Sequence, residues 1–470
     1  MKRLATIAAL ALLAACAPKE DFYTFHVAFP EGATLEQKVD MAAHLVPTPQ
    51  QLAWQKGELT AFVHFTVNTF TDREWGDGTE PESVFNPTEL STDQWCEALS
   101  AAGFRMVILT AKHHDGFCLW QTETTEHSVK NSPWMDGKGD VVAMLRKSCD
   151  KYGLGMGIYL SPWDRNAQCY GEGDAYNDFF CAQLTELLTN YGKVDEVWFD
   201  GACGEGPNGK KQAYDWVRIM SLIRELQPDA VTAIQGDDIR WVGNEAGKGR
   251  PSEWSPVALI PASEAQARQA AFEAGEAAFD PTASDLRATA EDLGSRSIIA
   301  DATDLWWRPA EVDVSIRPGW FYHEVQDSMV KSLESLQDIY FTSAGMNAVL
   351  LLNIPPDRRG LFHEADVRRL REFGEWKTAT FSEPSEGEFD IIMIGEDISM
   401  GQRVEKFHIE ISDDGKDWTT IAEGTTIGYK RLLRLSEPVS AAHVRYVIDE
   451  TRAEAHISEF KLYKNTIYQP

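Results

Sequence analysis

The sequence predicts an α/β protein: a (β/α)8-type barrel followed by a small C-terminal antiparallel β-sandwich. From about residue 59 to 378, short apolar runs alternate with amphipathic segments, which is the pattern of parallel strands joined by crossover helices. Beyond Phe381 the runs become short and alternate in polarity, and turns such as Asp413-Asp414-Gly415 separate them. The length of 470 residues and the hydrophobic content of 43% supply material for both domains.

Seven apolar runs of the first pattern predict barrel strands, and a weaker eighth lies near Ser297–Ala300. The seven are Thr60–Val67, Arg105–Thr110, Gly155–Leu160, Glu196–Asp200, Val231–Gln235, Val312–Ile316 and Ala348–Ile354. The amphipathic segments between them predict crossover helices. These helices are Thr92–Ala102, Val141–Tyr152, Asn177–Tyr191, Lys211–Leu226, Glu324–Phe341 and Ala365–Trp376.

Residues 256–296 interrupt the alternation. Their stretch Ala262–Ala278 is rich in Ala and Glu, and it predicts an inserted helical or mobile excursion after the fifth strand. Insertions on the C-terminal face of a barrel often shape the mouth of its site.

The C-terminal segment contains six short runs that predict the strands of the sandwich. They are Phe389–Ile394, Lys406–Ile411, Trp418–Ala422, Lys430–Leu435, His443–Ile448 and Ile457–Tyr463. We expect this domain to brace the barrel, with glycan binding as the alternative role, because a fold alone does not assign a function.

Charge and cysteine content exclude several classes of partner and site. The net charge of −29 argues against nucleic acid or an acidic lipid surface, since both would be repelled. The seven Cys form no CxxC pair and match no zinc spacing, so we expect neither a structural metal nor a disulfide that the fold requires.

The N-terminus has the features of an export signal. Met1-Lys2-Arg3 is basic, and the apolar run from Leu4 to Ala15 is too short to span a bilayer. Leu13-Ala14-Ala15-Cys16 resembles the bacterial lipoprotein box. That resemblance implies cleavage before Cys16 and a lipid on its thiol, and an ordinary secretory peptide cut nearby is the alternative. We expect an exported protein, lipid-anchored in a bacterial envelope, that meets the membrane only through this anchor.

These features divide the chain into four parts. Residues 1–15 are the predicted lipoprotein signal peptide and 16–45 a tether and lead-in, while 46–380 form the barrel and 381–470 the sandwich.

Polar residues gather just after the predicted barrel strands, at the face where such barrels keep their sites. Asp200 ends the fourth strand between Phe199 and Gly201, which suits an acid held beside a close-approaching ligand. A cap of the next helix is the alternative for this Asp. Four further clusters follow other strands, and together they point to a single site. These clusters are His64 with Glu74-Trp75, Ala111–Phe117, Tyr159–Arg165 and Arg240–Gly247.

The run His113-His114-Asp115 could in principle bind a metal, with His64 as a further ligand. Adjacent His side chains rarely bind one ion together, so we expect no metal here. Neutral imidazoles that bond the hydroxyls of a polyol are the preferred interpretation, and satisfied core histidines are the alternative.

Several motifs resemble the α-L-fucosidases of glycoside hydrolase family 29, over about residues 50–380. They are His64, Glu74-Trp75, AKHHDGF at 111–117, WFDG at 198–201 and LLLNIPPD at 350–357. A second set resembles the branch that prefers α-1,3 and α-1,4 linkages on Lewis-type glycans. That set is REWGDG (73–78), SPWDRN (161–166), GNEAG (243–247), SIRPGWFYH (315–323), GQRVEKF (401–407) and TTIGYKR (425–431).

The resemblance implies a retaining mechanism with two carboxyl groups about 5–5.5 Å apart. Asp200 matches the nucleophile, and Glu245 in the GNEAG run matches the acid/base, with Glu253 as the alternative. An acid that holds its proton near neutrality needs a partly apolar setting, for which Trp241 or Trp254 is a candidate.

The same resemblance implies a set of sugar-binding residues and no cofactor. His64, Glu74, Trp75, His113 and His114 match the residues that bind the fucose hydroxyls, and Tyr159 is a further candidate. Additional expectations are Trp307 or Trp320 against the methyl group of the sugar, and Trp163 and Asp164 on the leaving side.

The expected protein is thus an exo-acting α-L-fucosidase for fucosylated oligosaccharides of the Lewis type. Two alternatives remain open: a surface protein that binds fucosylated glycans without turnover, and a related glycosidase for another sugar such as galactose.

Overall fold

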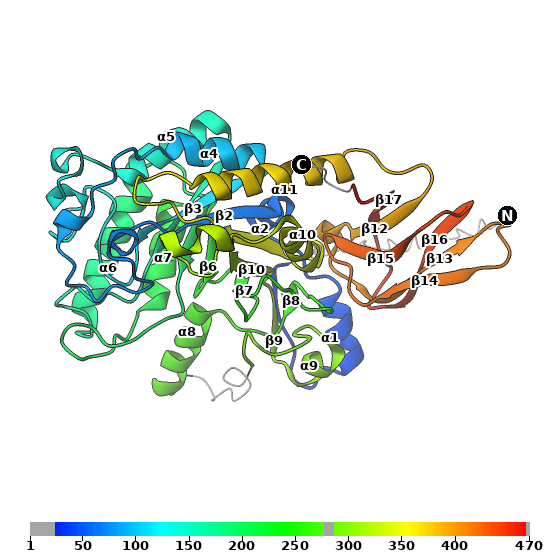
Figure 1. Cartoon of the computed structure of the whole chain (residues 1–470). Coiled ribbons are helices and arrows are strands. Elements are labelled where there is room, and N and C mark those ends of the chain that lie inside the picture. The colour runs from blue at the N-terminus through cyan, green and yellow to red at the C-terminus, as the bar shows by residue number, and fades with distance from the viewer. Residues whose placement is uncertain (1–23, 277–285, 467–470) are drawn as a thin grey trace, which may run out of the picture.

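A computed structural model describes residues 24–276 and 286–466 of the chain. A barrel with helices around it forms one end of the molecule, and a sandwich of antiparallel strands forms the other (Figure 1). Cys16 and the predicted signal peptide lie outside the described residues. Among the residues described, no helix combines the length and the apolar character that a membrane crossing requires.

Eight parallel strands form the barrel sheet, in the spatial order β6-β5-β4-β3-β2-β11-β10-β7. Their bounds are β2 (Leu59–Val63), β3 (Met106–Lys112), β4 (Gly155–Leu160), β5 (Glu196–Phe199), β6 (Val231–Ile234), β7 (Arg240–Trp241), β10 (Ala310–Ser315) and β11 (Val349–Asn353). The sheet curls until its two edges meet, where the amide of Ile239, just before β7, donates to the carbonyl of Thr232 in β6 at 3.0 Å. This confirms the predicted barrel class.

The eighth strand is not where the sequence pattern placed it. Residues 297–300 lie within helix α9 (Arg296–Asp301), whose N-cap Ser295 accepts from the amide of Ile298. The eighth barrel strand is instead the two-residue β7, which follows β6 without an intervening helix. A strand of two residues is too short to produce an apolar pattern, which is why the sequence did not reveal it.

Helices surround the barrel. They are α2 (Pro49–Gly57), α3 (Val67–Thr71), α4 (Thr92–Ala101), α5 (Val141–Tyr152), α6 (Asp174–Asn190), α7 (Trp216–Leu226), α10 (Leu333–Thr342) and α11 (Glu364–Phe381). Of these, α4, α5, α6, α7 and α11 lie within a few residues of predicted ranges, whereas α2 and α3 were not predicted. Helix α5 shows how local sequence sets the ends: Asp140 caps the amide of Ala143, and Gly153 ends the helix in the left-handed region at φ 68°. Glu324–Met329, predicted as the start of a longer helix, forms a separate 3-10 turn before α10.

The barrel strands alternate between two hydrophobic layers, as the period of two requires. In β3, Val107 and Leu109 pack outward against the helices, whereas Ile108 points into the barrel beside Phe62 of β2 and Trp198 of β5. The inward-facing side chains therefore form a packed layer inside the barrel, beneath the residues at the strand ends.

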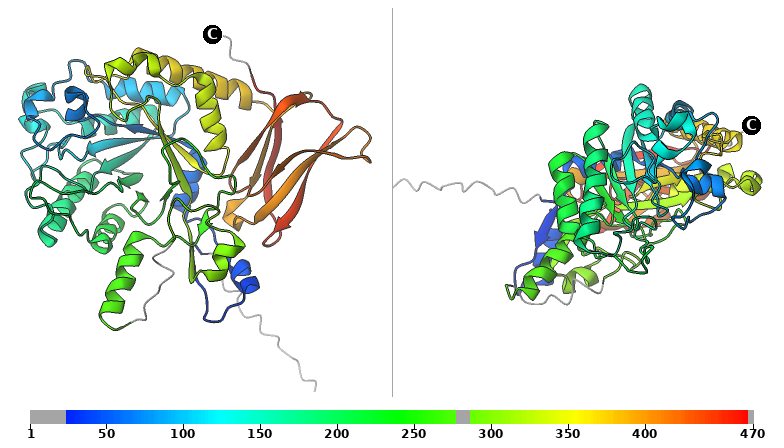
Figure 2. Two further views of the ribbon diagram at one scale, coloured as in Figure 1. Left: turned by 60° about the horizontal axis from the view of Figure 1, so that its bottom comes forward. Right: turned by 90° about the vertical axis from the view of Figure 1, so that its left-hand side faces the viewer.

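The predicted insertion lies between β7 and β10 and includes β8 (Pro256–Val257), helix α8 (Ala262–Glu273), α9 and β9 (Asp304–Trp307). The stretch 277–285, which includes the end of the predicted Ala262–Ala278 excursion, is outside the described residues. Strand β9 pairs with β8 and with the N-terminal β1 (His26–Ala28), which precedes helix α1 (Leu35–Ala42). Helix α8 extends from the lower edge of the barrel in the left view of Figure 2, with the sandwich at the right.

Two three-stranded antiparallel sheets form the sandwich, in the orders β15-β12-β17 and β14-β13-β16. Their strands are β12 (Phe389–Glu396), β13 (Val404–Ser412), β14 (Thr419–Gly424), β15 (Arg431–Val439), β16 (His443–Thr451) and β17 (Ile457–Tyr463). Ile391, Met393, Leu432 and Tyr463 of this domain belong to the same hydrophobic core as the barrel helices. This shared core is the contact that a bracing role requires.

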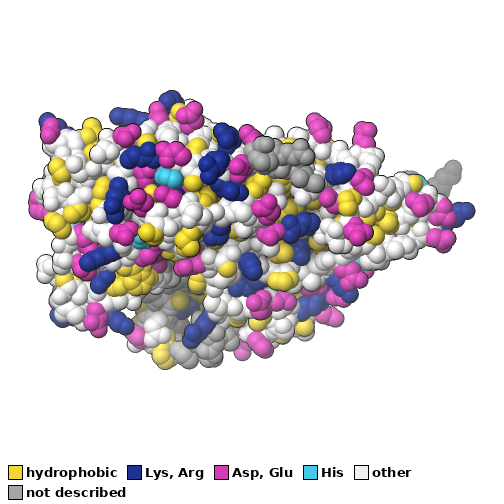
Figure 3. Space-filling view, viewed as in Figure 1, with side chains coloured by type: hydrophobic (Ala, Val, Ile, Leu, Met, Phe, Trp, Pro, Cys, Tyr) yellow, Lys and Arg dark blue, Asp and Glu magenta, His cyan; other side chains and the backbone are white. Residues whose placement is uncertain are grey.

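The cysteine side chains and the distribution of surface charge can be compared with what the sequence predicted. The six Cys that the structure describes are all free, with Cys96 and Cys149 in buried contact. On the face shown in Figure 3, acidic and basic side chains are interspersed over both domains.

Two glutamates face each other inside the barrel, and both are buried. Glu196 accepts from the indole of Trp54 at 2.8 Å, and Glu311 accepts from the indole of Trp198 at 2.7 Å. The other oxygen of each has no hydrogen-bond donor among the described residues. Burial raises the pKa of both carboxyl groups, so the folded protein holds this pair partly protonated.

We expect Glu196→Gln to flatten the dependence of stability on pH. Burial raises the pKa of Glu196 to about 8, whereas an exposed Glu titrates near 4.5. The folded state therefore keeps a proton that the unfolded chain releases, and the free energy of unfolding falls as pH rises between these values. Gln cannot ionise and still offers groups to Trp54 and Glu311.

The measurement is Tm across about pH 5 to 8.5, the window set by the ordinary and the raised pKa. The exposed Glu97→Gln serves as the control. Parallel Tm curves for the wild type and Glu196→Gln would contradict the raised pKa of Glu196.

Candidate active site

A cavity of about 850 Å³ opens at the C-terminal ends of the barrel strands. Most of the predicted site residues line it, although they come from different strands and loops. These are His64, Glu74, Trp75, His113, His114, Asp200, Glu245 and Trp320. The topology therefore gathers into one cavity the clusters that the sequence showed separately.

Asp200 follows β5 directly and is held by two donors. The hydroxyl of Tyr159, in the neighbouring β4, donates to Oδ2 at 3.0 Å, and the amide of Ala202 donates to Oδ1 at 2.8 Å. Burial raises the pKa of Asp200, and these hydrogen bonds oppose the rise because they favour the charged form. The alternative of a helix cap is wrong, since α7 begins at Trp216 and its cap is Asp215.

Three imidazoles near Asp200 are neutral at ordinary pH. Burial lowers the pKa of His64 and of His114 to about 3, and that of His113 well below its usual range. A charged imidazole would be costly in this enclosed place. The interpretation as neutral groups is therefore consistent with their surroundings.

Their partners fix which ring nitrogen faces the cavity. Nδ1 of His64 donates to Asn353 Oδ1 at 2.8 Å, which leaves Nε2 as an acceptor. Ser161 gives its own proton to the carbonyl of Trp163, so Nδ1 of His114 donates to Ser161 Oγ at 2.7 Å. Nε2 of His114 is then also an acceptor.

The third imidazole, that of His113, presents a hydrogen-bond donor to the cavity instead of an acceptor. Asn68 Nδ2 lies 3.4 Å from His113 Nδ1 and donates to it, which places a proton on Nε2 of His113. The cavity wall therefore presents one ring donor and two ring acceptors, an arrangement suited to hydroxyl groups, which both donate and accept.

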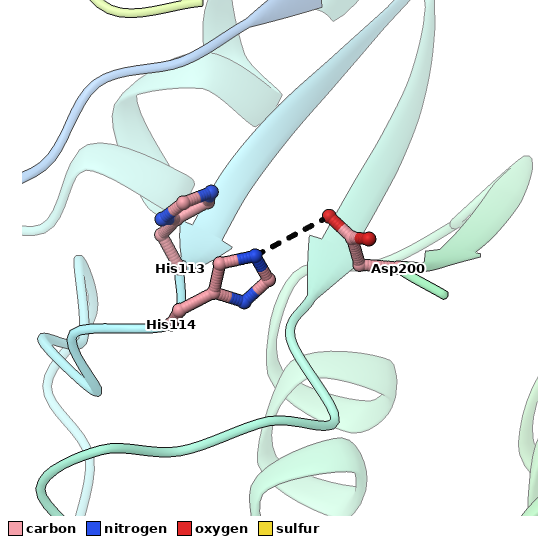
Figure 4. Close-up of side chains that lie close together, drawn as sticks. All are labelled: His113, His114 and Asp200. Atoms are coloured by element: carbon pink, nitrogen blue, oxygen red, sulfur yellow. Dashed lines mark ion pairs between the residues drawn. The ribbon is translucent and has the colours of Figure 1, made fainter. Parts of the chain in front are cut away.

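His113 and His114 directly follow β3, and Asp200 approaches them from the end of β5 (Figure 4). Nε2 of His114 lies 3.6 Å from Oδ2 of Asp200, and one ligand atom from each of the three residues falls within 4.8 Å of the others. Among the described residues this is the group spaced closely enough to hold a metal ion. The same spacing allows a single hydroxyl to contact both His114 and Asp200.

Glu74, Trp75 and Trp320 form the rim of the cavity. Glu74 accepts from the amide of Trp320 at 2.8 Å and from Nε2 of His323 at 2.6 Å. Trp75 is 54% exposed and packs edge to face on His114. An exposed indole beside polar groups is a surface on which the apolar face of a sugar can lie.

The two candidates for the acid/base lie in different environments. Glu245 is exposed, lines the cavity, and accepts from the indole of Trp320 at 3.3 Å. Glu253, the alternative, is 1% exposed and does not line the cavity, because it pairs with Arg240 and with Arg250 behind the wall. Only Glu245 is therefore placed to meet a ligand.

Four other predicted residues do not line the cavity. Trp307 is buried against α1 and donates to Gln55 at 3.0 Å, so the expectation that it faces the sugar is wrong. Trp163 packs behind Trp75 and His114, and Asp164 binds the buried ammonium of Lys112 at 2.9 Å. Tyr159 acts through its bond to Asp200.

The sequence analysis missed Gln235, Arg308 and Asp313, which also line the cavity. Asp313 had a detectable signal, since it and Glu311 occupy alternating positions in an otherwise apolar strand. An acid at an inward-facing barrel position requires a partner or a function.

Comparison with known proteins agrees with this geometry. The family model described as alpha-L-fucosidase matches residues 46–254 and 291–380. The chain is 39% identical to Alpha-L-fucosidase 1 of Arabidopsis thaliana, over 89% of this chain and 87% of the plant protein.

Solved structures give the same result. A candidate alpha-L-fucosidase from Bacteroides ovatus has a TM-score of 0.89 and 55% identity, covering 96% of this chain and 79% of that one. A Ruminococcus gnavus fucosidase of glycoside hydrolase family 29, in complex with fucose, has a TM-score of 0.76 and 30% identity, covering 90% of this chain and 95% of that one. This chain therefore belongs to the alpha-L-fucosidases of glycoside hydrolase family 29.

Proposed function

We propose that the protein is an exo-acting, retaining α-L-fucosidase that releases α-1,3- or α-1,4-linked fucose from Lewis-type glycans. The observation that carries the mechanism is that two carboxyl groups, Asp200 and Glu245, line one cavity together with imidazoles and indoles. The likeness of the GNEAG and SIRPGWFYH runs to one branch of the family supports the linkage preference.

In the first step, a carboxylate oxygen of Asp200 attacks the anomeric carbon while Glu245 gives its proton to the glycosidic oxygen. The bond between that carbon and oxygen breaks, and the sugar becomes an ester of Asp200. In the second step, ionised Glu245 takes a proton from water, and the resulting nucleophile attacks the same carbon. Asp200 leaves as a carboxylate, and two inversions give net retention.

The surroundings of Asp200 suit this role. Tyr159 and the amide of Ala202 hold its charged form in a fixed direction, whereas partial burial raises its pKa and so favours transfer of the carboxylate to the sugar. The neutral acceptors of His64 and His114 and the donor of His113 fix the sugar hydroxyls.

The decisive experiment combines substrate choice with product stereochemistry. We expect hydrolysis of a Lewis-type trisaccharide and of an aryl α-L-fucoside, with the α anomer of fucose appearing first by NMR. Asp200→Ala should lower kcat on the order of 10⁴-fold or more, as removal of a nucleophile does. Faster turnover of an aryl galactoside, an initial β anomer, or full activity of Asp200→Ala would each overturn the proposal.

We expect Tyr159→Phe to move the acidic limb of the kcat/KM profile to higher pH. The variant removes a donor that favours ionised Asp200, so the pKa of Asp200 rises further and its carboxylate is lost earlier as pH falls. Tyr214→Phe is the matched control, because its hydroxyl bonds Tyr170 away from the cavity. An unmoved acidic limb in Tyr159→Phe would show that this bond does not set the titration.

We also propose that the protein is exported and anchored by a lipid on Cys16. The proposal rests on the lipoprotein-like run Leu13–Cys16. When the protein is expressed in a bacterial host, we expect the wild type in the membrane fraction and in the detergent phase after phase separation. The Cys16→Ser variant should be recovered in the aqueous phase. A wild type that is recovered only in the aqueous phase would instead indicate an ordinary secretory peptide.

A further inference from the structure

Asp313 is a further carboxyl group on the cavity, and no step of the mechanism uses it. It lies on β10 and is 4% exposed, and its Oδ1 accepts from the indole of Trp241 at 2.8 Å. No side chain among the described residues donates to its other oxygen. Burial next to the charges of Glu245 and Asp200 raises the pKa of Asp313 to about 7, and Glu311 lies on the same face of the strand.

The partner of Asp313 belongs to the segment that carries Glu245. Trp241 is the last residue of β7, and the chain runs on directly from it to Glu245. Trp320, which follows β10, donates its indole proton to Glu245 at 3.3 Å. The segment after β7 and the segment of β10 are therefore joined by two hydrogen bonds, in each of which an indole N–H of one segment donates to a carboxyl group of the other.

The loop that contains Glu245 has few other anchors on this side. Gly243 and Gly247 have positive φ values of 96° and 72°, and Asn244 bonds only within the loop, to the carbonyl of Lys248 and the amide of Ala246. The hydroxyl of Thr342 holds the far end at the carbonyl of Gly247. The near end is held by the amide of Val242, which donates to the carbonyl of Glu311 at 3.0 Å, and by the indole of Trp241 through its bond to Asp313.

We propose that Asp313 is a positioning residue: by holding the indole of Trp241, it fixes the loop that places Glu245 over the glycosidic bond. This inference rests on the proposed role of Glu245 as acid/base. A shift of about 1 Å in a catalytic group is enough to lower a rate by about 100-fold, so an anchor of this kind matters although it touches no substrate.

The test uses leaving groups that differ in their need for a proton. A trisaccharide has a poor leaving group and requires the acid, whereas 2,4-dinitrophenyl α-L-fucoside does not. We expect Asp313→Ala to lower kcat/KM for the trisaccharide by about 10- to 100-fold and for the dinitrophenyl fucoside by less than about threefold. Trp241→Phe should give the same pattern, because it removes the indole N–H that Asp313 accepts, together with part of the ring.

A double-mutant cycle separates positioning from an independent effect. Once Glu245→Gln has removed the acid, adding Asp313→Ala should cause no further loss on the trisaccharide. Asp313→Asn keeps an acceptor for Trp241 and should restore most of the activity. Asp292→Ala is the matched control, since Asp292 also accepts from an indole, that of Trp254 at 2.7 Å, but does not line the cavity.

The outcomes distinguish this inference from the function on which it rests. Equal losses on both substrates, or additive losses with Glu245→Gln, would overturn the positioning role and leave the acid/base assignment intact. If Glu245→Gln itself shows no dependence on the leaving group, the acid/base assignment fails and the inference falls with it. Unchanged Tm values in Asp313→Asn and Trp241→Phe exclude misfolding as the cause.

Discussion

The site depends on one interaction: a half-buried carboxylate, Asp200, held between the hydroxyl of Tyr159 and the amide of Ala202. A charge in so enclosed a position is costly unless donors surround it. The two donors come from the neighbouring strand and from the turn that follows Asp200, so the pairing of β4 with β5 and the shape of that turn set the position of the reactive group. The barrel provides the rigidity that keeps these donors in place.

The same enclosure determines the state of the imidazoles. Burial keeps His64, His113 and His114 uncharged, and their inner nitrogens are occupied by Asn353, Asn68 and Ser161. Each outer nitrogen is left with a defined role as donor or acceptor. A pocket built in this way recognises the hydroxyl pattern of a neutral sugar without adding positive charge beside Asp200, which would stabilise that carboxylate and reduce its nucleophilicity.

The sequence predicted the parts of the fold that are long and periodic. Strands β2 to β6 and helix α5 were found because their apolar residues recur with the right period. Strand β7 was missed because two residues have no period, and a weak apolar run in α9 was taken for a strand in its place. The local sequence does not contain this information, since β7 exists only through its pairing with β10.

In the candidate site, too, local motifs predicted some features and tertiary packing determined the others. Motifs at strand ends predicted that Asp200, Glu245 and the imidazoles lie together, and they line one cavity because the ends of parallel barrel strands converge. The directions of Trp307, Trp163 and Asp164 depend on packing that no motif encodes, and they lie behind the wall.

The hydrophobic core that the sandwich shares with the barrel has a consequence for the whole chain. Leu432 and Tyr463 cover apolar surface of the barrel helices, and the amide of Leu432 donates to Gly345 next to α10. A barrel expressed without its last 90 residues would expose that surface to water and tend to aggregate. The two architectures should therefore melt in one cooperative transition and be retained or lost together as a single evolutionary module.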